Sequence, residues 1–182
     1  MVFDVVGIGN PVYDIIITPV IKTDGRVLSG CSTNACLAVK KLGMQKVGLI
    51  GSIGEDFSER FLLDMNHYGI ETSLNAASEH TGGFRLVYDR KGDRTLEVLG
   101  VADKITPRSI PEEFLDSRFF LIGPILGEVD LELIKFIRES TNAKIFLDPQ
   151  GLIRSIGSGG KITHICNRDE FKRIVELVSR RL

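Results

Sequence analysis

The chain has 182 residues, of which 43% are hydrophobic and 26% charged, the composition of an ordinary globular protein with a core of its own. Its 23 basic and 24 acidic residues almost cancel, so electrostatics favours neither nucleic acid nor an anionic membrane as a partner. No apolar run approaches the roughly 18 residues of a membrane span, and no basic stretch precedes an apolar one at the amino terminus. We therefore expect a cytoplasmic protein.

The first third of the chain predicts strands and a helix in alternation. Strands are expected over residues 5–8, 13–18 and 46–50, where β-branched and aliphatic side chains run together. Between them the stretch 33–42, rich in Ala and Leu, predicts a helix. Gly43 follows it at the position where a left-handed residue commonly ends a helix.

A second helix is predicted to begin at Asp56 and to end at Gly69. Asp56 and Glu59 have the spacing of a capping box, in which each side chain satisfies a free backbone N–H group at the start of the helix. The apolar stripe of this helix is predicted to consist of Phe61, Leu62, Met65 and Tyr68.

The rest of the chain continues the alternation and adds a hairpin. Residues 84–88 and 94–99 read as strands on either side of the turn-forming segment 89–93. Further strands are expected over 119–122, 144–147 and 162–165, and further helices around 131–137 and after Asn167. This alternation predicts an α/β protein with a mostly parallel sheet and helices on both faces. The hairpin and the run 15–17 interrupt it, so we expect them to form a small flap outside the main sheet.

The three cysteines, Cys31, Cys36 and Cys166, form no C-x-x-C pair, and the three histidines are scattered along the chain. An odd number of thiols in this arrangement argues against a disulfide framework or a zinc site. We expect reduced thiols without a catalytic role.

Two polar segments near the amino terminus are candidate ligand sites. Asp14 follows the first strand after a short turn, and a carboxylate there can accept hydrogen bonds from two sugar hydroxyls. A surface aspartate at the start of a strand is the alternative. The segment 29–34 opens a helix with small residues, which leaves backbone N–H groups free, and Asn34 offers a donor and an acceptor. Simple capping by Ser32 or Thr33 is the alternative there.

Two further segments could approach a phosphate or a metal ion, and a third only resembles a phosphate-binding loop. The run 51–56 holds two glycines between a strand and a helix, which favours either close backbone approach to a ligand or a plain tight turn. Asn167 and Glu170 open the last helix, where they either form a capping box or hold Mg²⁺ through water. The glycine-rich run 157–161 is not a P-loop, because Ser155 stands where that motif needs its first glycine.

In their order and spacing, these segments together resemble the ribokinase-like PfkB family of carbohydrate kinases over essentially all 182 residues. The run 9–14 is similar to that family's opening strand and its substrate-binding aspartate. Gly30 and Asn34 resemble its G-G-x-x-x-N helix, with Ser29 in place of the first glycine. The remaining matches are 51–56 with its G-x-x-G-x-D element, 81–82 and the hairpin with its lid, 147–149 with its L-D-P strand end, and Asn167 and Glu170 with its N-x-x-E motif.

The resemblance implies one ribokinase-like, Rossmann-type domain over residues 1–182, as the amino-terminal portion of a larger fold. Lid segments are expected within it at approximately 12–30 and 81–100. Because the first lid segment is short, and because of the run 148–154, the chain is similar to the short-lid, inositol-kinase-like branch of the family.

For function, the resemblance implies ATP-dependent phosphorylation of a sugar, polyol or nucleoside. It implies that Asp14, Gly30 and Asn34 bind the substrate and that Asn167 and Glu170 position Mg²⁺ and phosphate. The family's G-A-G-D motif, which supplies the catalytic base and the anion hole, does not occur in the sequence. We therefore expect the base and most of the ATP pocket to lie outside these residues, and little or no phosphoryl transfer by the chain alone. The resemblance also implies a homodimer formed through the lid strands.

Three alternatives stay open on the sequence alone. The chain could be a non-catalytic polyol-binding module, or one subunit of a split enzyme whose second chain carries the G-A-G-D half. It could also be a structural or interaction domain that only keeps the fold, in which case changing Asp14 would affect stability alone.

Overall fold

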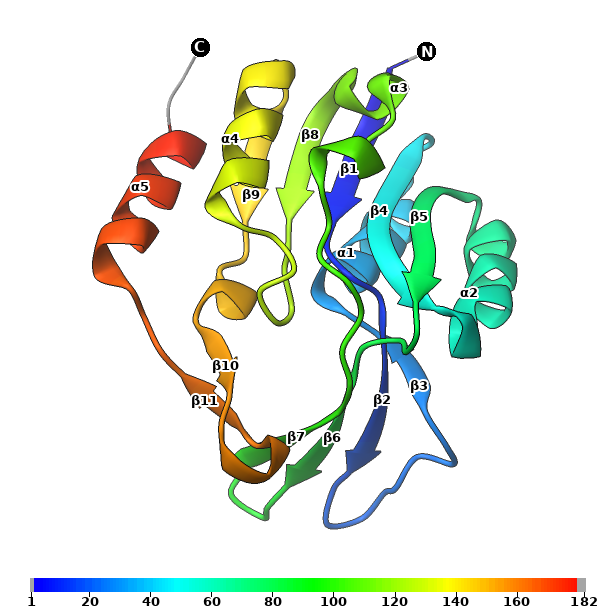
Figure 1. The fold of residues 1–182 in the computed structure, drawn as a ribbon. Helices are drawn as coiled ribbons and strands as arrows, with labels where there is room; N and C mark the ends of the chain where they lie inside the picture. The colour runs from blue at the N-terminus through cyan, green and yellow to red at the C-terminus, as the bar shows by residue number, and fades with distance from the viewer. Residues whose placement is uncertain (1, 180–182) are drawn as a thin grey trace.

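The computed structural model describes residues 2–179, except for the side chain of residue 77. Its main sheet has the strand order β5-β4-β1-β8-β9, and every pairing in it is parallel (Figure 1). These strands are β1 (Phe3–Ile8), β4 (Val47–Gly54), β5 (Ile70–Ser78), β8 (Ser117–Ile122) and β9 (Lys144–Leu147). The α/β class and the mostly parallel sheet predicted from the sequence are confirmed.

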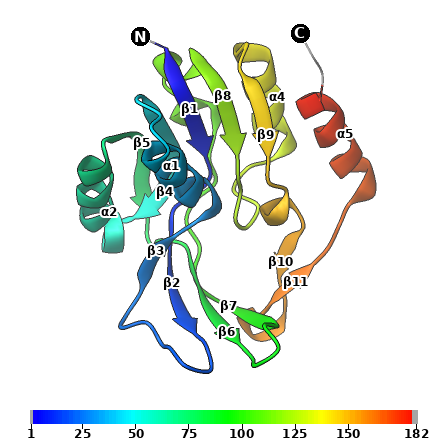
Figure 2. The ribbon, with the colours of Figure 1, turned by 180° about the vertical axis from the view of Figure 1, so that it is seen from behind.

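Helices cover both faces of the main sheet. On one face lie α1 (Cys31–Lys41) and α2 (Glu55–Tyr68), and on the other α4 (Leu131–Ser140) and α5 (Arg168–Ser179) (Figures 1 and 2). Leu49 and Ile50 are neighbours in β4 and both fully buried, but they belong to opposite hydrophobic clusters. Successive side chains of a strand point to opposite faces, so this buried strand needs apolar residues without alternation. The short helix α3 (Glu112–Leu115) adds Phe114 to the cluster that contains Ile50 and lies beneath α4 and α5.

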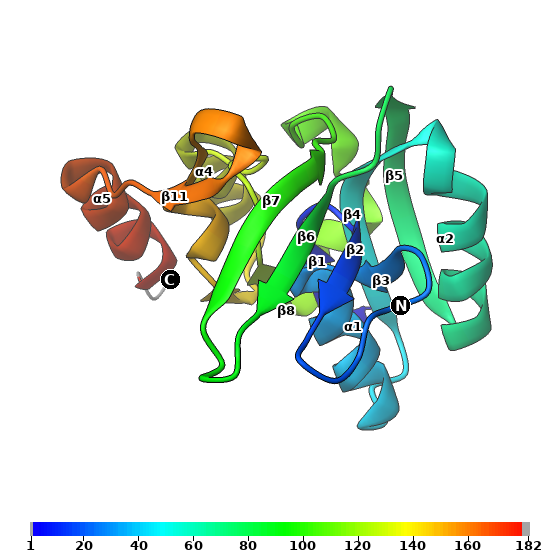
Figure 3. The same cartoon turned by 90° about the horizontal axis from the view of Figure 1, so that it is seen from below.

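A second, four-stranded sheet lies beyond the carboxyl ends of the main strands (Figures 1 and 3), and we call it the lid sheet. Its order is β3-β2-β6-β7, formed by β2 (Val12–Ile17), β3 (Val27–Ser29), β6 (Gly83–Tyr88) and β7 (Arg94–Gly100). The pairing of β2 with β6 is parallel, whereas β3 and β7 pair antiparallel to their neighbours. The lid sheet therefore joins two chain segments that are far apart in the sequence.

A two-stranded antiparallel ribbon completes the fold beside the lid sheet. It consists of β10 (Arg154–Ile156) and β11 (Ile162–His164), and a bridge between Glu97 and Lys161 connects it to β7. Single 3-10 turns occur at Pro107–Ser109, Gln150–Leu152 and Ser158–Gly160. Within residues 2–179, the longest helices are too short or too polar to cross a membrane.

Asp56 ties the lid sheet to the main sheet instead of capping α2. Strand β4 runs on through Gly54, so α2 begins at Glu55 and no side chain caps it. The Oδ1 atom of Asp56 accepts hydrogen bonds from the N–H group of Thr81 at 2.9 Å and from its hydroxyl at 2.6 Å. The predicted capping box of Asp56 and Glu59 is therefore wrong, because the longer strand moves Asp56 from the cap into the first turn of the helix.

The buried face of α2 is narrower than the sequence predicts. Phe61 and Met65 are buried, whereas Leu62 is 42% exposed and Tyr68 is 36% exposed. Helix α2 packs on β4 and on the edge strand β5, so a single stripe of side chains reaches the sheet.

Candidate functional site

A cavity of about 200 Å³ lies between the lid sheet and the carboxyl ends of the main strands. Asp14, Gly30 and Asn34, predicted from separate segments of the sequence, all line it. An apolar wall is contributed by the lid-sheet side chains of Val12, Phe84, Leu86 and Leu96. The cavity thus combines an apolar surface with a few converging polar groups, as small-molecule sites commonly do.

Asp14 is a buried carboxylate held by the lid. Its side chain is 4% exposed, and its Oδ1 atom accepts a hydrogen bond from the N–H group of Phe84 at 2.8 Å. Burial raises its pKa, while hydrogen bonds from Ser29 and Phe84 and the nearby Arg26 and Arg154 act in the opposite direction. The alternative of a surface aspartate does not hold, because a carboxylate buried this deeply needs donors from its surroundings.

Helix α1 presents its amino terminus at the same cavity. Gly30 is the N-cap, with φ 117° and ψ 142°, a backbone conformation that favours glycine. No side chain caps the helix, so the alternative interpretation, capping by Ser32 or Thr33, does not hold. The Ser32 hydroxyl instead donates to the Ile8 carbonyl at 2.8 Å, because the side chain is buried against β1. The first-turn N–H groups therefore stay available to an oxygen-rich ligand, next to the exposed side chain of Asn34.

Asn167 and Glu170 line a different cavity, of about 210 Å³, together with Lys104 and Asp130. The N–H group of Glu170 donates to Asn167 Oδ1 at 3.4 Å, which is the predicted helix cap. The Glu170 carboxylate accepts from the side-chain Nδ2 of Asn167 at 3.4 Å rather than from its backbone N–H group. The structure thus separates the five sequence-predicted residues into a group of three and a group of two.

The second cavity could hold a metal ion only with help from other groups. Within residues 2–179, no cluster of three or more His, Cys, Asp or Glu side chains has the arrangement of a metal site. Asn167 and Glu170 are exposed and offer oxygen atoms. This donor set fits Mg²⁺, which keeps several waters and commonly binds through one or two carboxylates and the phosphates of a substrate.

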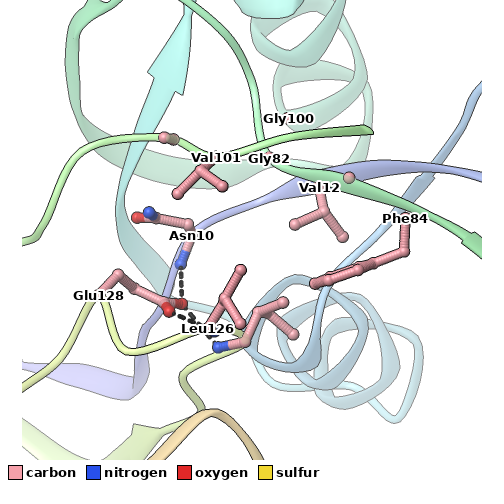
Figure 4. Close-up of a pocket in the computed structure, with 11 residues that line it drawn as sticks. Asn10, Val12, Gly82, Phe84, Gly100, Val101, Leu126 and Glu128 are labelled. Atoms are coloured by element: carbon pink, nitrogen blue, oxygen red, sulfur yellow. Dashed lines mark hydrogen bonds between the residues drawn. The ribbon is translucent and has the colours of Figure 1, made fainter. Parts of the chain in front are cut away.

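Two buried polar residues that the sequence reasoning missed brace the site (Figure 4). The carboxylate of Glu128, 5% exposed, accepts hydrogen bonds from the backbone N–H groups of Asn10 at 3.0 Å, Ile125 at 2.8 Å and Leu126 at 2.8 Å. The Asn10 side chain in turn accepts from the N–H group of Ser52 at 2.7 Å. These bonds connect the segments that follow β1 and β8 with β4. No pattern in the sequence marks Glu128.

Cys31 lies in the wall of the cavity that holds Asp14, beside Asp148. Its thiol donates to Asp148 Oδ2 at 3.2 Å. Burial, reinforced by this carboxylate, raises the pKa of the Cys31 thiol to about 12. The thiol is therefore protonated at neutral pH, which argues against a nucleophilic role.

With this geometry in view, comparisons with known proteins point to one group of enzymes. No family model matches the sequence. The chain is 31% identical over 139 residues to the cytidine kinase of Thermococcus kodakarensis, a match that covers 74% of this chain and 48% of that protein.

Solved structures give the same result for the fold. A pyrophosphate-dependent kinase in the ribokinase family superposes with a TM-score of 0.74 at 19% identity, over 88% of this chain and 55% of that one. Adenosine kinase from Sinorhizobium meliloti gives a TM-score of 0.66 at 15% identity, over 81% and 56%. Ribokinase from Thermotoga maritima gives 0.62 at 18% identity, over 81% and 52%.

The fold, a parallel α/β sheet with a cavity beneath a second sheet, is shared with solved small-molecule kinases. More particularly, the chain is ribokinase-like, and its resemblance to the PfkB family of carbohydrate kinases is confirmed by these similarities. The chain spans about half the length of the relatives it matches.

Proposed function

We propose that this chain is the substrate-binding portion of a PfkB-type kinase that transfers a phosphoryl group to a hydroxyl of a sugar, polyol or nucleoside. The observation that carries the proposal is the convergence of Asp14, Gly30 and Asn34 on one cavity beneath the lid sheet. The 31% identity to a cytidine kinase supports the same reaction class.

In this proposal, Asp14 accepts hydrogen bonds from substrate hydroxyls, and Asn34 supplies a donor and an acceptor beside it. Asp14 is already fixed through its bond to the N–H group of Phe84, so little conformational freedom is lost on binding. The apolar wall of the lid sheet excludes water from the hydroxyl that reacts.

Mg²⁺ is the cofactor expected for this chemistry, and Asn167 and Glu170 would hold it through waters and phosphate. When bound, the ion neutralises charge on the phosphoryl group that is transferred. ATP is the donor that the family resemblance implies. Three of the similar structures are described as those of pyrophosphate-dependent kinases, so pyrophosphate belongs in the same assays.

We place the catalytic base outside these 182 residues, since no G-A-G-D motif occurs among them. The alternative is a catalytically incomplete polyol-binding protein, or a split-enzyme subunit completed by a second chain. One observation favours a partner of that kind. Phe146 on the edge strand β9 is 55% exposed, and its ring centre lies 5.9 Å from that of Phe119. An exposed aromatic side chain on an unpaired strand edge favours association.

We also propose a cytoplasmic homodimer formed through the lid strands. Strand β3 is an edge of the lid sheet, and Val20 and Ile21, in the loop before it, are 88% and 66% exposed. Unpaired strand edges next to exposed apolar side chains favour association. Sedimentation of the chain at micromolar concentration measures this directly.

The central test is calorimetric titration of the chain with ribose, myo-inositol, cytidine and adenosine. We expect at least one of them to bind, and Asn34→Ala to weaken that binding about tenfold through the loss of one or two hydrogen bonds. Asn66→Ala, at an exposed position on α2, is the matched control and should change nothing. The absence of binding across this panel and its charged analogues would overturn the proposal.

An assay of phosphoryl transfer with Mg²⁺ and either ATP or pyrophosphate then shows whether the chain only binds the substrate or also phosphorylates it. Binding without turnover fits a substrate-binding portion that needs a further segment or chain. Steady-state turnover by the pure chain would mean that the residues present here complete a kinase site among themselves.

A further inference from the structure

Arg154 places a guanidinium group with free donors at the wall of the cavity that holds Asp14. The side chain is half-buried, at the start of β10. Its Nη1 atom donates to the Ile125 carbonyl at 3.3 Å, and its guanidinium carbon lies 5.7 Å from the Phe84 ring centre. In the part of the chain that the structure describes, no carboxylate oxygen lies within 4.0 Å of a guanidinium nitrogen of Arg154, so Arg154 forms no ion pair there. Arginine carries five N–H donors, so most of them are unused here.

Arg94 brings a second guanidinium to the same cavity from a different element. It lies at the start of β7, is exposed, and donates from Nη1 to the Tyr88 hydroxyl at 3.1 Å. After burial, the positive charge of Arg94 is the largest influence that lowers the pKa of Arg154, so the two cations are close to each other. Two like charges that converge on one cavity repel each other until an anion lies between them.

The carboxylates nearby do not satisfy these two cations. Asp14 is the one carboxylate among the described residues that line the cavity. Asp148 and Glu128 lie outside this lining, and both already accept other hydrogen bonds. Asp148 accepts from the Cys31 thiol at 3.2 Å and from the N–H group of Gln150 at 3.0 Å. Glu128 accepts from three backbone N–H groups. The charged side chains that line the cavity are therefore two cations and one carboxylate.

We propose that the substrate of this site carries an anionic group, a carboxylate or a phosphate, which Arg94 and Arg154 bind while Asp14 holds its hydroxyls. The inference rests on the proposed function, since it takes the cavity to be the substrate site. Guanidinium groups bind carboxylate and phosphate through paired hydrogen bonds, and the half-buried position of Arg154 strengthens such a bond. A sugar acid or a sugar phosphate carries both kinds of group, whereas a neutral sugar leaves the arginines unpaired.

The test is titration with matched pairs that differ in charge: ribose against ribose 5-phosphate, and glucose against glucuronate. Pyrophosphate is titrated separately, because the anion could also belong to a phosphoryl donor. We expect a charged member to bind at least about tenfold more tightly than its neutral partner. Arg154→Gln should weaken the charged member about ten- to hundredfold and the neutral member hardly at all. Salt raised from about 50 to 500 mM should weaken the charged member selectively.

Arg85→Gln is the control, because Arg85 lies on the lid strand β6 and pairs with Glu97 at 3.4 Å, away from the cavity lining. If Arg154→Gln does not fold, Arg94→Gln serves instead, since Arg94 is exposed. Equal affinity for both members of each pair, unchanged by the substitutions, would overturn the inference and leave the proposed function standing. Arginine-dependent binding of pyrophosphate alone would assign the anion to the donor and also overturn it. No binding by any compound would remove the proposed function together with the inference.

Discussion

Replacing Asp14 by Asn should weaken ligand binding and stabilise the fold at the same time. Asparagine has nearly the shape of aspartate, and its Oδ1 atom can still accept the 2.8 Å hydrogen bond from the N–H group of Phe84. What the substitution removes is a negative charge on a side chain that is 4% exposed. The substitution also replaces the second carboxylate oxygen by an NH2 group, so its effects report on the charge together with one acceptor.

The two effects have opposite signs. Hydrogen bonds to a charged group contribute about 1.5–3 kcal/mol each, so losing one charge-assisted bond to a substrate hydroxyl should cost about ten- to hundredfold in affinity. Burial raises the pKa of Asp14 above its ordinary value of 3.8, so the folded state holds the proton more tightly than the unfolded chain. Asp14 therefore contributes its full stabilisation to folding below pH 3.8, and this contribution is lost as pH rises through the raised pKa of the folded state. At pH 7 the free energy of unfolding should rise by about 0.5–2 kcal/mol in Asp14→Asn.

Urea unfolding of both proteins at pH 7 and at pH 4 measures the stability effect, and the gain should shrink at the lower pH. Calorimetric titration with the best ligand of the panel measures the affinity. Asp24→Asn is the control, because Asp24 is an exposed carboxylate in the loop between β2 and β3. Wild-type affinity in Asp14→Asn would refute the binding role. A loss of stability at pH 7 would show that the fold requires the ionised carboxylate, which contradicts the reasoning from burial.

Two further substitutions test the contacts that position the site. Asp56→Ala removes the acceptor for both donors of Thr81, so residues 81–88 should exchange their amide hydrogens faster, with a local loss of about 1–3 kcal/mol; unchanged exchange there would show that the lid sheet is held elsewhere. Glu128→Gln replaces a carboxylate that accepts from three backbone N–H groups by an amide with one oxygen, and should lower the free energy of unfolding by about 2 kcal/mol. The exposed Glu132→Gln is its control in the same urea titration, and equal stability of the two variants would contradict this account.

The fold could be predicted from the sequence where burial is strong, and not where hydrogen bonding to a neighbour sets the structure. Strand β9 has the predicted bounds, and α4 falls on its predicted apolar spacing. Strand β5 was not predicted, because its stretch is rich in polar residues and few of its side chains face the core. As an edge strand it is defined mainly by its pairing with β4. The glycines of β4 were interpreted as a tight turn or as a point of close backbone approach to a ligand, although the backbone continues as a strand through Gly54.

The candidate site was predictable in the same partial way. Asp14, Gly30 and Asn34 belong to motifs whose order along the chain carries information, and all three line one cavity. Arg94 and Arg154 belong to no such pattern, since one starts a hairpin strand and the other starts a short ribbon. They become neighbours only because the lid sheet and the segment after β9 meet at the cavity. The approach of two positively charged side chains therefore follows from the tertiary structure and not from the local sequence.

The two cavities differ in how far this chain completes them, and that difference explains why binding and transfer should be separable. The first cavity lies among elements that hydrogen-bond to one another: β2 pairs with β6, Asp56 accepts from Thr81, and Glu128 accepts from Asn10 in the turn after β1. Asn167 and Glu170, in contrast, are exposed at the start of a helix and hydrogen-bond mainly to each other. A substrate can therefore meet a preformed site, whereas a metal ion and a phosphate donor would need further ligands. Ligand binding that is independent of Mg²⁺ is the behaviour this arrangement predicts.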